Sequence, residues 1–158
     1  MYADGCQQVY EQDSVLSCVY GDATARHTIA LVGGSHSTHW LPALEPIARA
    51  HGWRIVTYLK DLCRFGLAPG RAYGKPYPSC DRWKTEVTQR LLADPPDVVF
   101  TTATYAGDGP ETVPDGFVEA WRKLGEAGVA VIAVRDTPFM GFQVAECVEL
   151  RGVTAAEC

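Results

Sequence analysis

The sequence predicts an α/β protein: a three-layer α/β/α sandwich around a parallel sheet. Short, uninterrupted apolar runs alternate with amphipathic segments of helical period, and Gly or Pro residues separate the two. Such runs are typical of parallel strands covered by helices on both faces. The 158 residues fit one domain, with residues 1–26 as an irregular, disulfide-bearing lead-in and residues 27–158 as the α/β core.

The first half of the core alternates strand, helix and strand. We expect a strand at residues 27–32, a helix at about 35–50, a second strand at 53–59 and a long Gly- and Pro-rich loop at 61–80. Pro42 and Pro46 predict an irregular turn or a kink, because proline removes a helical hydrogen bond. Gly52 is placed to end the helix in the left-handed conformation.

The second half repeats this order. We expect a helix at residues 81–93 with Asp81 as its N-cap, a strand at 97–102, a polar loop at 103–112, a helix at 114–127 closed by Gly128, and a fourth strand at 129–134. The remaining residues, 135–158, read as mostly loop with one short helical turn.

Composition and charge exclude several classes of function. Lys and Arg total 14 against 19 Asp and Glu, and no basic stripe is clustered in the sequence, which argues against nucleic acid as a partner. No apolar run approaches the roughly 20 residues that span a bilayer, and the first eight residues do not resemble a signal segment. No cofactor is indicated, because the glycine-rich phosphate-binding patterns are incomplete; a nucleotide-binding α/β protein is the least favoured alternative.

The six cysteines are unusual for a cytosolic enzyme. No Cys-x-x-Cys and no Cys–His zinc spacing occurs, so no metal site is expected. The cysteines form three sequence-local couples, and we expect sequential disulfides outside the cytoplasm, with six buried free thiols as the alternative. These couples are Cys6 with Cys18, Cys63 with Cys80, and Cys147 with Cys158.

Ligands of such sheets bind at the carboxyl ends of the strands. Three segments should meet at that edge: residues 33–36, 101–108 and 135–138. Ser35 lies where the first strand turns into a helix, so backbone N–H groups there could stabilise an oxyanion formed when its hydroxyl attacks an ester. The alternative is that Ser35 is simply the helix N-cap.

Residues 30–44, Ala-Leu-Val-Gly-Gly-Ser-His-Ser-Thr-His-Trp-Leu-Pro-Ala-Leu, resemble the first conserved block of the SGNH hydrolase superfamily. They most resemble the SGNH domains fused to actinobacterial acyltransferase-3 (O-acyltransferase) membrane proteins. The resemblance continues through residues 52–54, 57–63, 80–83, 96–100 and 135–138, and so covers nearly the whole chain.

This resemblance implies a flavodoxin-like SGNH fold, here with four visible strands and shortened at its carboxyl end. It implies Ser35 as the nucleophile of an extracytoplasmic O-acyltransferase or esterase domain. The acyl group would be acetyl, carried on a cell-surface glycan or acyl-sugar. A membrane acyltransferase domain in the same parent protein would be a partner.

The sequence also departs from the family pattern. Gly34 stands where the family has Asp, and the sequence contains no Asn for the oxyanion hole. All four histidines (His27, His36, His39 and His51) lie within the first 51 residues, so the family's carboxyl-terminal Asp-x-x-His is missing; we expect it beyond residue 158. The alternative is a non-catalytic SGNH-like module, a pseudoenzyme, that binds a glycan or a protein.

Other residues are candidates for the lining of the site. His39, four residues after Ser35, is favoured over His36 as a local base, although a surface or core role is the simpler reading for both. Asp136 is either a site carboxylate or a turn brace. Thr101, Thr102 and Thr104 occupy the place of the family's oxyanion donors, with Gly34 and Thr102 as lining residues. Lys60 and Asp61 read as a solvated pair, and Trp40 and Trp83 as core residues.

Overall fold

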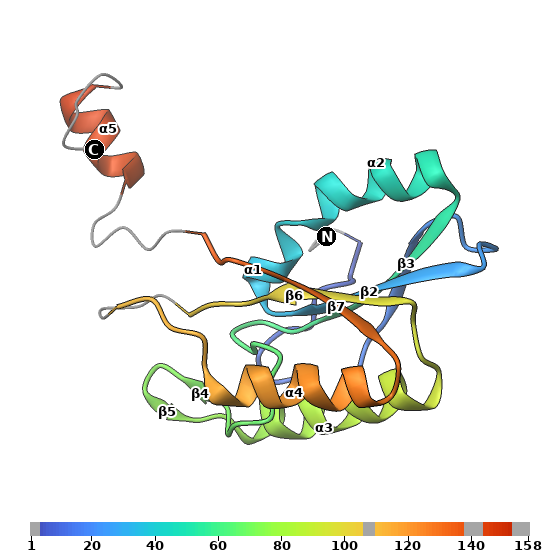
Figure 1. Cartoon of the computed structure of the whole chain (residues 1–158). Helices are drawn as coiled ribbons and strands as arrows, with labels where there is room; N and C mark the ends of the chain where they lie inside the picture. Colours follow the sequence, from blue (N-terminus) through green and yellow to red (C-terminus); the bar gives the residue numbers. More distant parts are fainter. Residues whose placement is uncertain (1–3, 106–109, 138–143, 153–158) are drawn as a thin grey trace.

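The computed structural model describes residues 4–105, 110–137 and 144–152, and a five-stranded sheet forms its centre (Figure 1). The sheet strands are β1 (Cys18–Gly21), β2 (His27–Gly33), β3 (Trp53–Leu59), β6 (Val98–Thr102) and β7 (Ala130–Val134). The helices are α1 (Ser35–Thr38), α2 (Leu41–His51), α3 (Pro78–Ala93), α4 (Asp115–Glu126) and α5 (Val144–Arg151). A small hairpin pairs β4 (Arg71–Ala72) with β5 (Lys75–Pro76).

The strand order β1-β3-β2-β6-β7 confirms the predicted α/β architecture. β2 pairs in parallel with β3 and β6, and β6 pairs in parallel with β7. β1 differs from the expectation of an irregular lead-in, because residues 18–21 pair antiparallel with β3. The four residues of β1 are too few to show a period, and their pairing with a distant strand defines them as a strand.

The sheet is covered on both faces (Figure 1). α1 and α2 lie on one face, where Leu31 and Ile55 are fully buried in a cluster that includes Phe100. α3 and α4 lie on the other face, where Val32 and Trp83 are fully buried. Neighbouring residues of β2 thus enter two different cores, which explains why the strand is apolar without interruption.

The predicted helix at residues 35–50 is divided into α1 and α2. Pro42 occupies the first turn of α2, where a missing N–H leaves no intrahelical bond unmade, so a new helix begins there. Pro46 lies inside α2. Gly52 ends α2 with φ 62°, the left-handed conformation that was predicted. The predicted core position of Trp40 fits its contact with Phe100, with ring centroids 5.6 Å apart.

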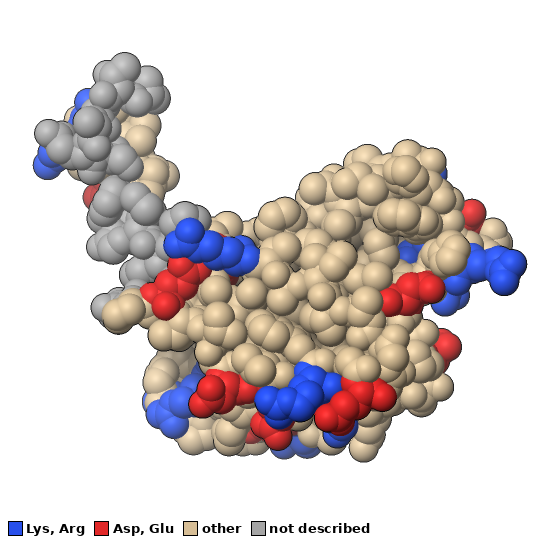
Figure 2. Space-filling model, in the orientation of Figure 1, with Lys and Arg blue, Asp and Glu red and all other residues tan. Residues whose placement is uncertain are grey.

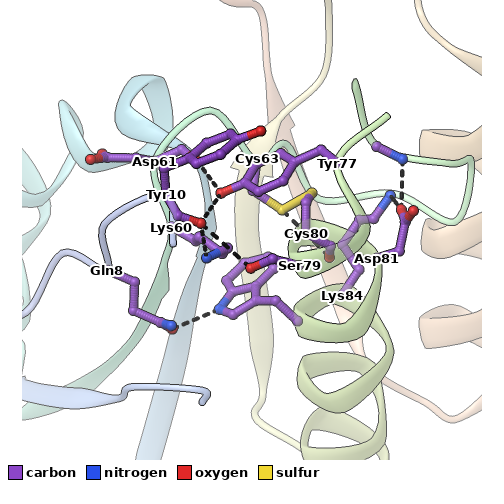
Figure 3. Close-up of a disulfide and its surroundings, with 12 residues drawn as sticks. Gln8, Tyr10, Lys60, Asp61, Cys63, Tyr77, Ser79, Cys80, Asp81 and Lys84 are labelled. Carbon is purple, nitrogen blue, oxygen red and sulfur yellow. Dashed lines mark hydrogen bonds and ion pairs between the residues drawn. A yellow bond between two sulfur atoms is a disulfide. The ribbon is translucent and has the colours of Figure 1, made fainter. Parts of the chain in front are cut away.

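The loop between β3 and α3 is more ordered than the sequence indicates. It contains the β4–β5 hairpin, and the Cys63–Cys80 disulfide closes it (Figure 3). α3 begins at Pro78, so the predicted N-cap role of Asp81 is wrong. The Asp81 carboxylate instead accepts a hydrogen bond from the Gly70 N–H at 2.6 Å and pairs with the Lys84 ammonium at 2.9 Å.

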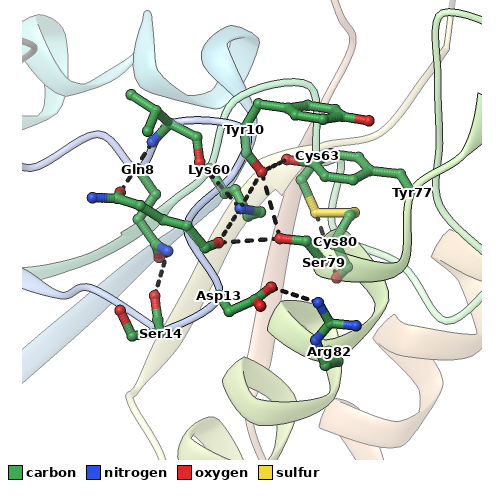
Figure 4. Close-up of polar contacts among 12 residues, drawn as sticks. Gln8, Tyr10, Asp13, Ser14, Lys60, Cys63, Tyr77, Ser79, Cys80 and Arg82 are labelled. Carbon is green, nitrogen blue, oxygen red and sulfur yellow. Dashed lines mark hydrogen bonds and ion pairs between the residues drawn. A yellow bond between two sulfur atoms is a disulfide. The ribbon is translucent and has the colours of Figure 1, made fainter.

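Lys60 binds the lead-in to the core (Figure 4). Its side chain is fully buried, and its ammonium donates to the backbone carbonyls of Val9, Tyr10 and Gln12 at 3.2, 3.1 and 2.5 Å. The predicted solvated role of Lys60 is therefore wrong, and burial lowers the pKa of its ammonium. Asp61 accepts a hydrogen bond from the Gln7 side chain at 2.9 Å.

Two of the predicted disulfides are confirmed. Cys6–Cys18 joins the lead-in to β1, and Cys63–Cys80 has Cα atoms 5.5 Å apart. The alternative of free thiols is wrong for these four cysteines. The third predicted couple includes Cys158, which lies outside the described residues.

On the face drawn in Figure 2, positively and negatively charged side chains alternate along the layer formed by α3 and α4. Within the described part of the chain, no helix is long and apolar enough to cross a membrane.

Candidate active site

Ser35 lies in a pocket at the carboxyl edge of the sheet. The cavity measures about 50 Å³, and its lining comes from the turn after β2, the loop after β3 and the end of β6: Gly34, Ser35, His36, Leu62, Arg64 and Thr102. Ser35 is the first residue of α1 and the N-cap is Gly34, so Ser35 does not cap the helix. The serine is half-buried in this pocket.

Gly33 permits the tight turn that places Ser35. Its φ of 141° lies outside the range that residues with a side chain usually adopt. A Cβ at this position would lie 2.2 Å from Ser37 Oγ. Gly34 is different, because its backbone is extended and a Cβ would lie 3.4 Å from the Cys63 carbonyl oxygen. The turn therefore requires glycine at position 33 and tolerates a side chain at position 34.

The His36 ring and the Asp136 carboxylate are joined by a hydrogen bond beside Ser35. The His36 Nδ1 atom lies 2.6 Å from Asp136 Oδ1, and the carboxylate is buried, with 2% of the side chain exposed. Oδ1 also accepts a hydrogen bond from the Thr137 N–H at 2.8 Å. Asp136 follows β7 and His36 follows β2, so the contact crosses the end of β6, which lies between them.

His39, which the sequence favoured over His36, is exposed and does not line the pocket. Its ring stacks on that of His36, with centroids 5.7 Å apart. Both histidines follow Ser35 closely in sequence. Only the position of Asp136 in the folded chain shows which of them has a carboxylate partner. No sequence signal could have made this choice, because Asp136 is 100 residues away from His36.

The Asp136 backbone is itself fixed. Its N–H donates to Thr104 Oγ1 at 2.8 Å, and the Thr104 hydroxyl donates to Glu111 Oε1 at 2.6 Å. Arg135 Nε donates to Glu111 Oε2 at 2.7 Å, and the Arg135 and Thr104 hydrogen bonds lower the pKa of Glu111. Thr104 thus positions Asp136 and does not line the pocket as an oxyanion donor would.

The other two threonines lie at different depths. Thr102 lines the pocket with Ser35. Thr101 is fully buried below it, and its hydroxyl, like that of Ser37, has no hydrogen-bond partner within the described part of the protein. Thr102 is therefore the threonine that could face a bound acyl group.

Arg64 was not predicted as a site residue, because nothing in the Gly- and Pro-rich loop distinguishes it. Its guanidinium lies 4.5 Å from the centre of the Tyr105 ring, and Nη2 is 3.8 Å from Asp136 Oδ2. Its Nε–H is buried and has no hydrogen-bond partner among the described residues. Arg64 therefore supplies positive charge to the pocket.

The two other histidines lie away from the pocket. His27 is exposed, with Nδ1 3.4 Å from Asp97, and His51 stacks on Trp53 with ring centroids 4.9 Å apart. The described residues contain no group of three or more His, Cys, Asp or Glu side chains arranged to hold a metal ion.

The fold and this pocket define an α/β domain that presents a serine at the carboxyl edge of a mostly parallel sheet. The chain belongs to the family of SGNH domains fused to AT3 domains, whose model matches residues 5–158. This confirms the resemblance that the sequence motifs indicated. The comparison with curated protein sequences found no match.

One similar solved structure is the periplasmic domain of a lipopolysaccharide acetyltransferase from Salmonella ser. Paratyphi A. The TM-score is 0.55 at 16% identity, and the match covers 71% of this chain and 45% of that chain. The likeness therefore concerns the fold, and this chain corresponds to less than half of the other domain.

Proposed function

We propose that this chain is the extracytoplasmic part of an enzyme that transfers or removes acyl groups on cell-surface glycans. The acyl group that we propose is acetyl. Membership of a family fused to AT3 domains supports a membrane acyltransferase domain in the parent protein as the partner. The structural neighbour is named as an acetyltransferase. Disulfides persist outside the reducing cytoplasm, which supports the location.

The observation that carries the proposal is that Ser35 and His36 line one pocket and that His36 is paired with the buried Asp136 carboxylate. Serine needs an adjacent base, itself oriented by a third group, to become a nucleophile at neutral pH. The buried Asp136 carboxylate favours a hydrogen on His36 Nδ1, which leaves the lone pair of Nε2 to accept a proton. The chain itself thus supplies an acid–histidine pair, although the sequence lacks the family's Asp-x-x-His.

In the proposed mechanism, Ser35 Oγ attacks the acyl carbonyl while its proton passes to His36 Nε2. The leaving alcohol departs with that proton, and an acyl-serine remains. A glycan hydroxyl or water then attacks the acyl carbon, returns its proton to Ser35 Oγ through His36 and releases the product. The Thr102 hydroxyl is the proposed donor to the oxyanion, in place of the family's Asn.

Hydrolysis of an aryl acetate tests this proposal. Ser35→Ala should abolish turnover, and His36→Gln should lower kcat by about 10²- to 10⁴-fold, the usual contribution of a positioned base. His39→Gln is the matched control and should leave turnover unchanged, because His39 is exposed and outside the pocket. Turnover that survives His36→Gln but not Ser35→Ala would place the base elsewhere; turnover that survives both would refute the nucleophile.

A non-catalytic binding module is the second candidate function. It is favoured by the absence of Asn and of any histidine after His51 in the sequence. Under this hypothesis the wild-type chain is no more active than Ser35→Ala. Calorimetric binding of a glycan would then be the same for both proteins.

A further inference from the structure

A second pocket adjoins the one that contains Ser35. It has a volume of about 180 Å³ and shares Leu62 and Arg64 with the serine pocket. Its floor and walls come from the loop between β3 and α3, from Tyr105 and from the start of α4 at Phe117. A ligand in this second pocket would therefore lie next to the reacting acyl group.

The second pocket is positively charged, although the chain carries a net charge of −5. Arg64, Arg71 and Lys84 line it, and no Asp or Glu is among its described lining residues. Lys84 is neutralised by Asp81 at 2.9 Å. Arg71 is exposed, and its guanidinium donates a hydrogen bond to the uncharged carbonyl of Gly74. Arg64 lies 3.8 Å from the Asp136 carboxylate, whose other oxygen is bound by His36, so Asp136 balances its charge only in part. The charge available to a ligand is therefore that of Arg71 and part of that of Arg64.

The lining also offers apolar and aromatic surface. Tyr105 and Leu62 are 45% and 40% exposed, and the Arg64 guanidinium lies against the Tyr105 ring. Leu62 has φ 57°, a left-handed conformation that costs a residue with a side chain of its size about 1 kcal/mol or more. Strained backbone of this kind persists where the surroundings hold it in place.

The surroundings of Leu62 provide that support (Figure 3). Cys63 is joined to Cys80 in α3, and the Tyr77 hydroxyl donates to the Asp61 carbonyl at 3.1 Å. The residues on either side of Leu62 are thus fixed to α3 and to the segment before it. The rim between the two pockets is held in place before any ligand binds.

From these observations we propose that the second pocket is a subsite for a sugar residue that bears an anionic group, a carboxylate or a phosphate. The anionic group pairs with Arg64 and Arg71, and the apolar face of the ring packs on Leu62 and Tyr105. The inference rests on the proposed function, because it makes this residue part of the acyl-bearing or acyl-accepting glycan. Selection of charged over neutral glycans follows from it.

Binding of small sugars to the Ser35→Ala variant tests the subsite without turnover. The probes are methyl β-D-glucuronide, methyl β-D-glucoside 6-phosphate and the neutral methyl β-D-glucoside, titrated into ¹⁵N-labelled protein and followed by NMR. We expect at least one anionic probe to shift the amides of residues 62–71 and 105, and the neutral probe to bind about tenfold more weakly or not at all, the scale of one charge-assisted hydrogen bond. The carboxylate and phosphate arms distinguish the two sources of charge.

Arginine variants assign the binding to the pocket. Arg64→Gln and Arg71→Gln should each weaken the anionic probe by about tenfold. Arg26→Gln is the control, because it removes the same charge from an exposed position before β2, at the opposite edge of the sheet. If Arg64→Gln does not fold, the exposed Arg71 decides the question.

Equal binding of neutral and anionic probes, or an equal loss in Arg26→Gln, would overturn the subsite. Failure of the proposed function has a different signature: the anionic probe binds through Arg64 and Arg71, while the wild-type chain cleaves no aryl acetate. Cleavage of the acetate without any preference for anionic sugars would refute the subsite alone.

Discussion

The turn that presents Ser35 predicts opposite effects for alanine at two adjacent glycines. At Gly33 the backbone has φ 141°, and a new Cβ would lie 2.2 Å from Ser37 Oγ. At Gly34 the φ of −91° is ordinary, and a new Cβ would lie 3.4 Å from the Cys63 carbonyl oxygen, at the edge of normal contact. The two substitutions add the same methyl group, so they differ in environment alone.

Two costs combine for Gly33→Ala. A non-glycine residue in such a sparsely populated conformation costs about 1–3 kcal/mol, and overpacking of a closely packed site costs about 1–3 kcal/mol. We therefore expect a loss of about 2–6 kcal/mol, a large part of the stability of a typical domain. Gly34→Ala gains about 0.4–1 kcal/mol from a less flexible unfolded chain, which offsets its tight contact, so its stability should stay within about 1 kcal/mol of the wild type.

Urea unfolding followed by circular dichroism measures both values, with equal m-values as the condition for comparing them. Aryl acetate hydrolysis by the folded fraction gives a second readout, because a shift of the turn moves Ser35 away from the His36–Asp136 pair. If Gly33→Ala is as stable as Gly34→Ala, the turn adapts to a side chain, and the argument that Gly33 fixes the serine is refuted.

Three further substitutions have defined outcomes. Lys60→Met should lower the free energy of unfolding by about 2–4 kcal/mol in urea titrations, because three backbone carbonyls of the lead-in lose the buried ammonium that binds them; an unchanged value would contradict the role of Lys60 in holding the lead-in. Replacing Cys63 and Cys80 together by Ser should cost about 3 kcal/mol, and the oxidised wild type should lose as much on reduction of this bond. The hydrogen bond from the Thr28 N–H lowers the pKa of Asp97, so its contribution to stability is present above the unfolded pKa of about 4 and is lost as pH falls through the folded pKa. Asp97→Asn should therefore flatten the acid limb of the stability profile, and an unaltered limb would show that Asp97 is not linked to folding.

The strands could be predicted because their signals are local. Leu31 and Val32 enter opposite cores, and this alternation in space appears in the sequence as an unbroken apolar run. Gly52 could be identified as a helix end for the same reason, since a left-handed residue after a helix needs no distant partner. β1 could not be predicted in this way, because its four residues are a strand through their pairing with β3.

Burial of charge was the least predictable property. Lys60 reads as a surface residue in sequence, because lysine is almost never fully buried. It is buried here because the lead-in provides backbone carbonyls, and these partners come from 48 to 51 residues away. The same limit applies to Arg64, whose place between two pockets depends on the path of a loop that has no repeating pattern.

The choice of His36 over His39 follows from the position of Asp136 in the folded chain. His36 and His39 are three residues apart, a spacing that brings side chains together on one face of a helix, and their rings stack with centroids 5.7 Å apart. Helix geometry alone therefore does not distinguish the two histidines. The sheet order places β7 two strands from β2, and the Thr104–Glu111 hydrogen bonds hold Asp136 at that point. The position of Asp136 thus selects His36, and the exposed His39 stacks on its outer side. A site assembled in this way depends on β7 and on the loop before α4 as much as on the serine motif, so Glu111 and Thr104 are part of what makes Ser35 reactive in the proposed mechanism.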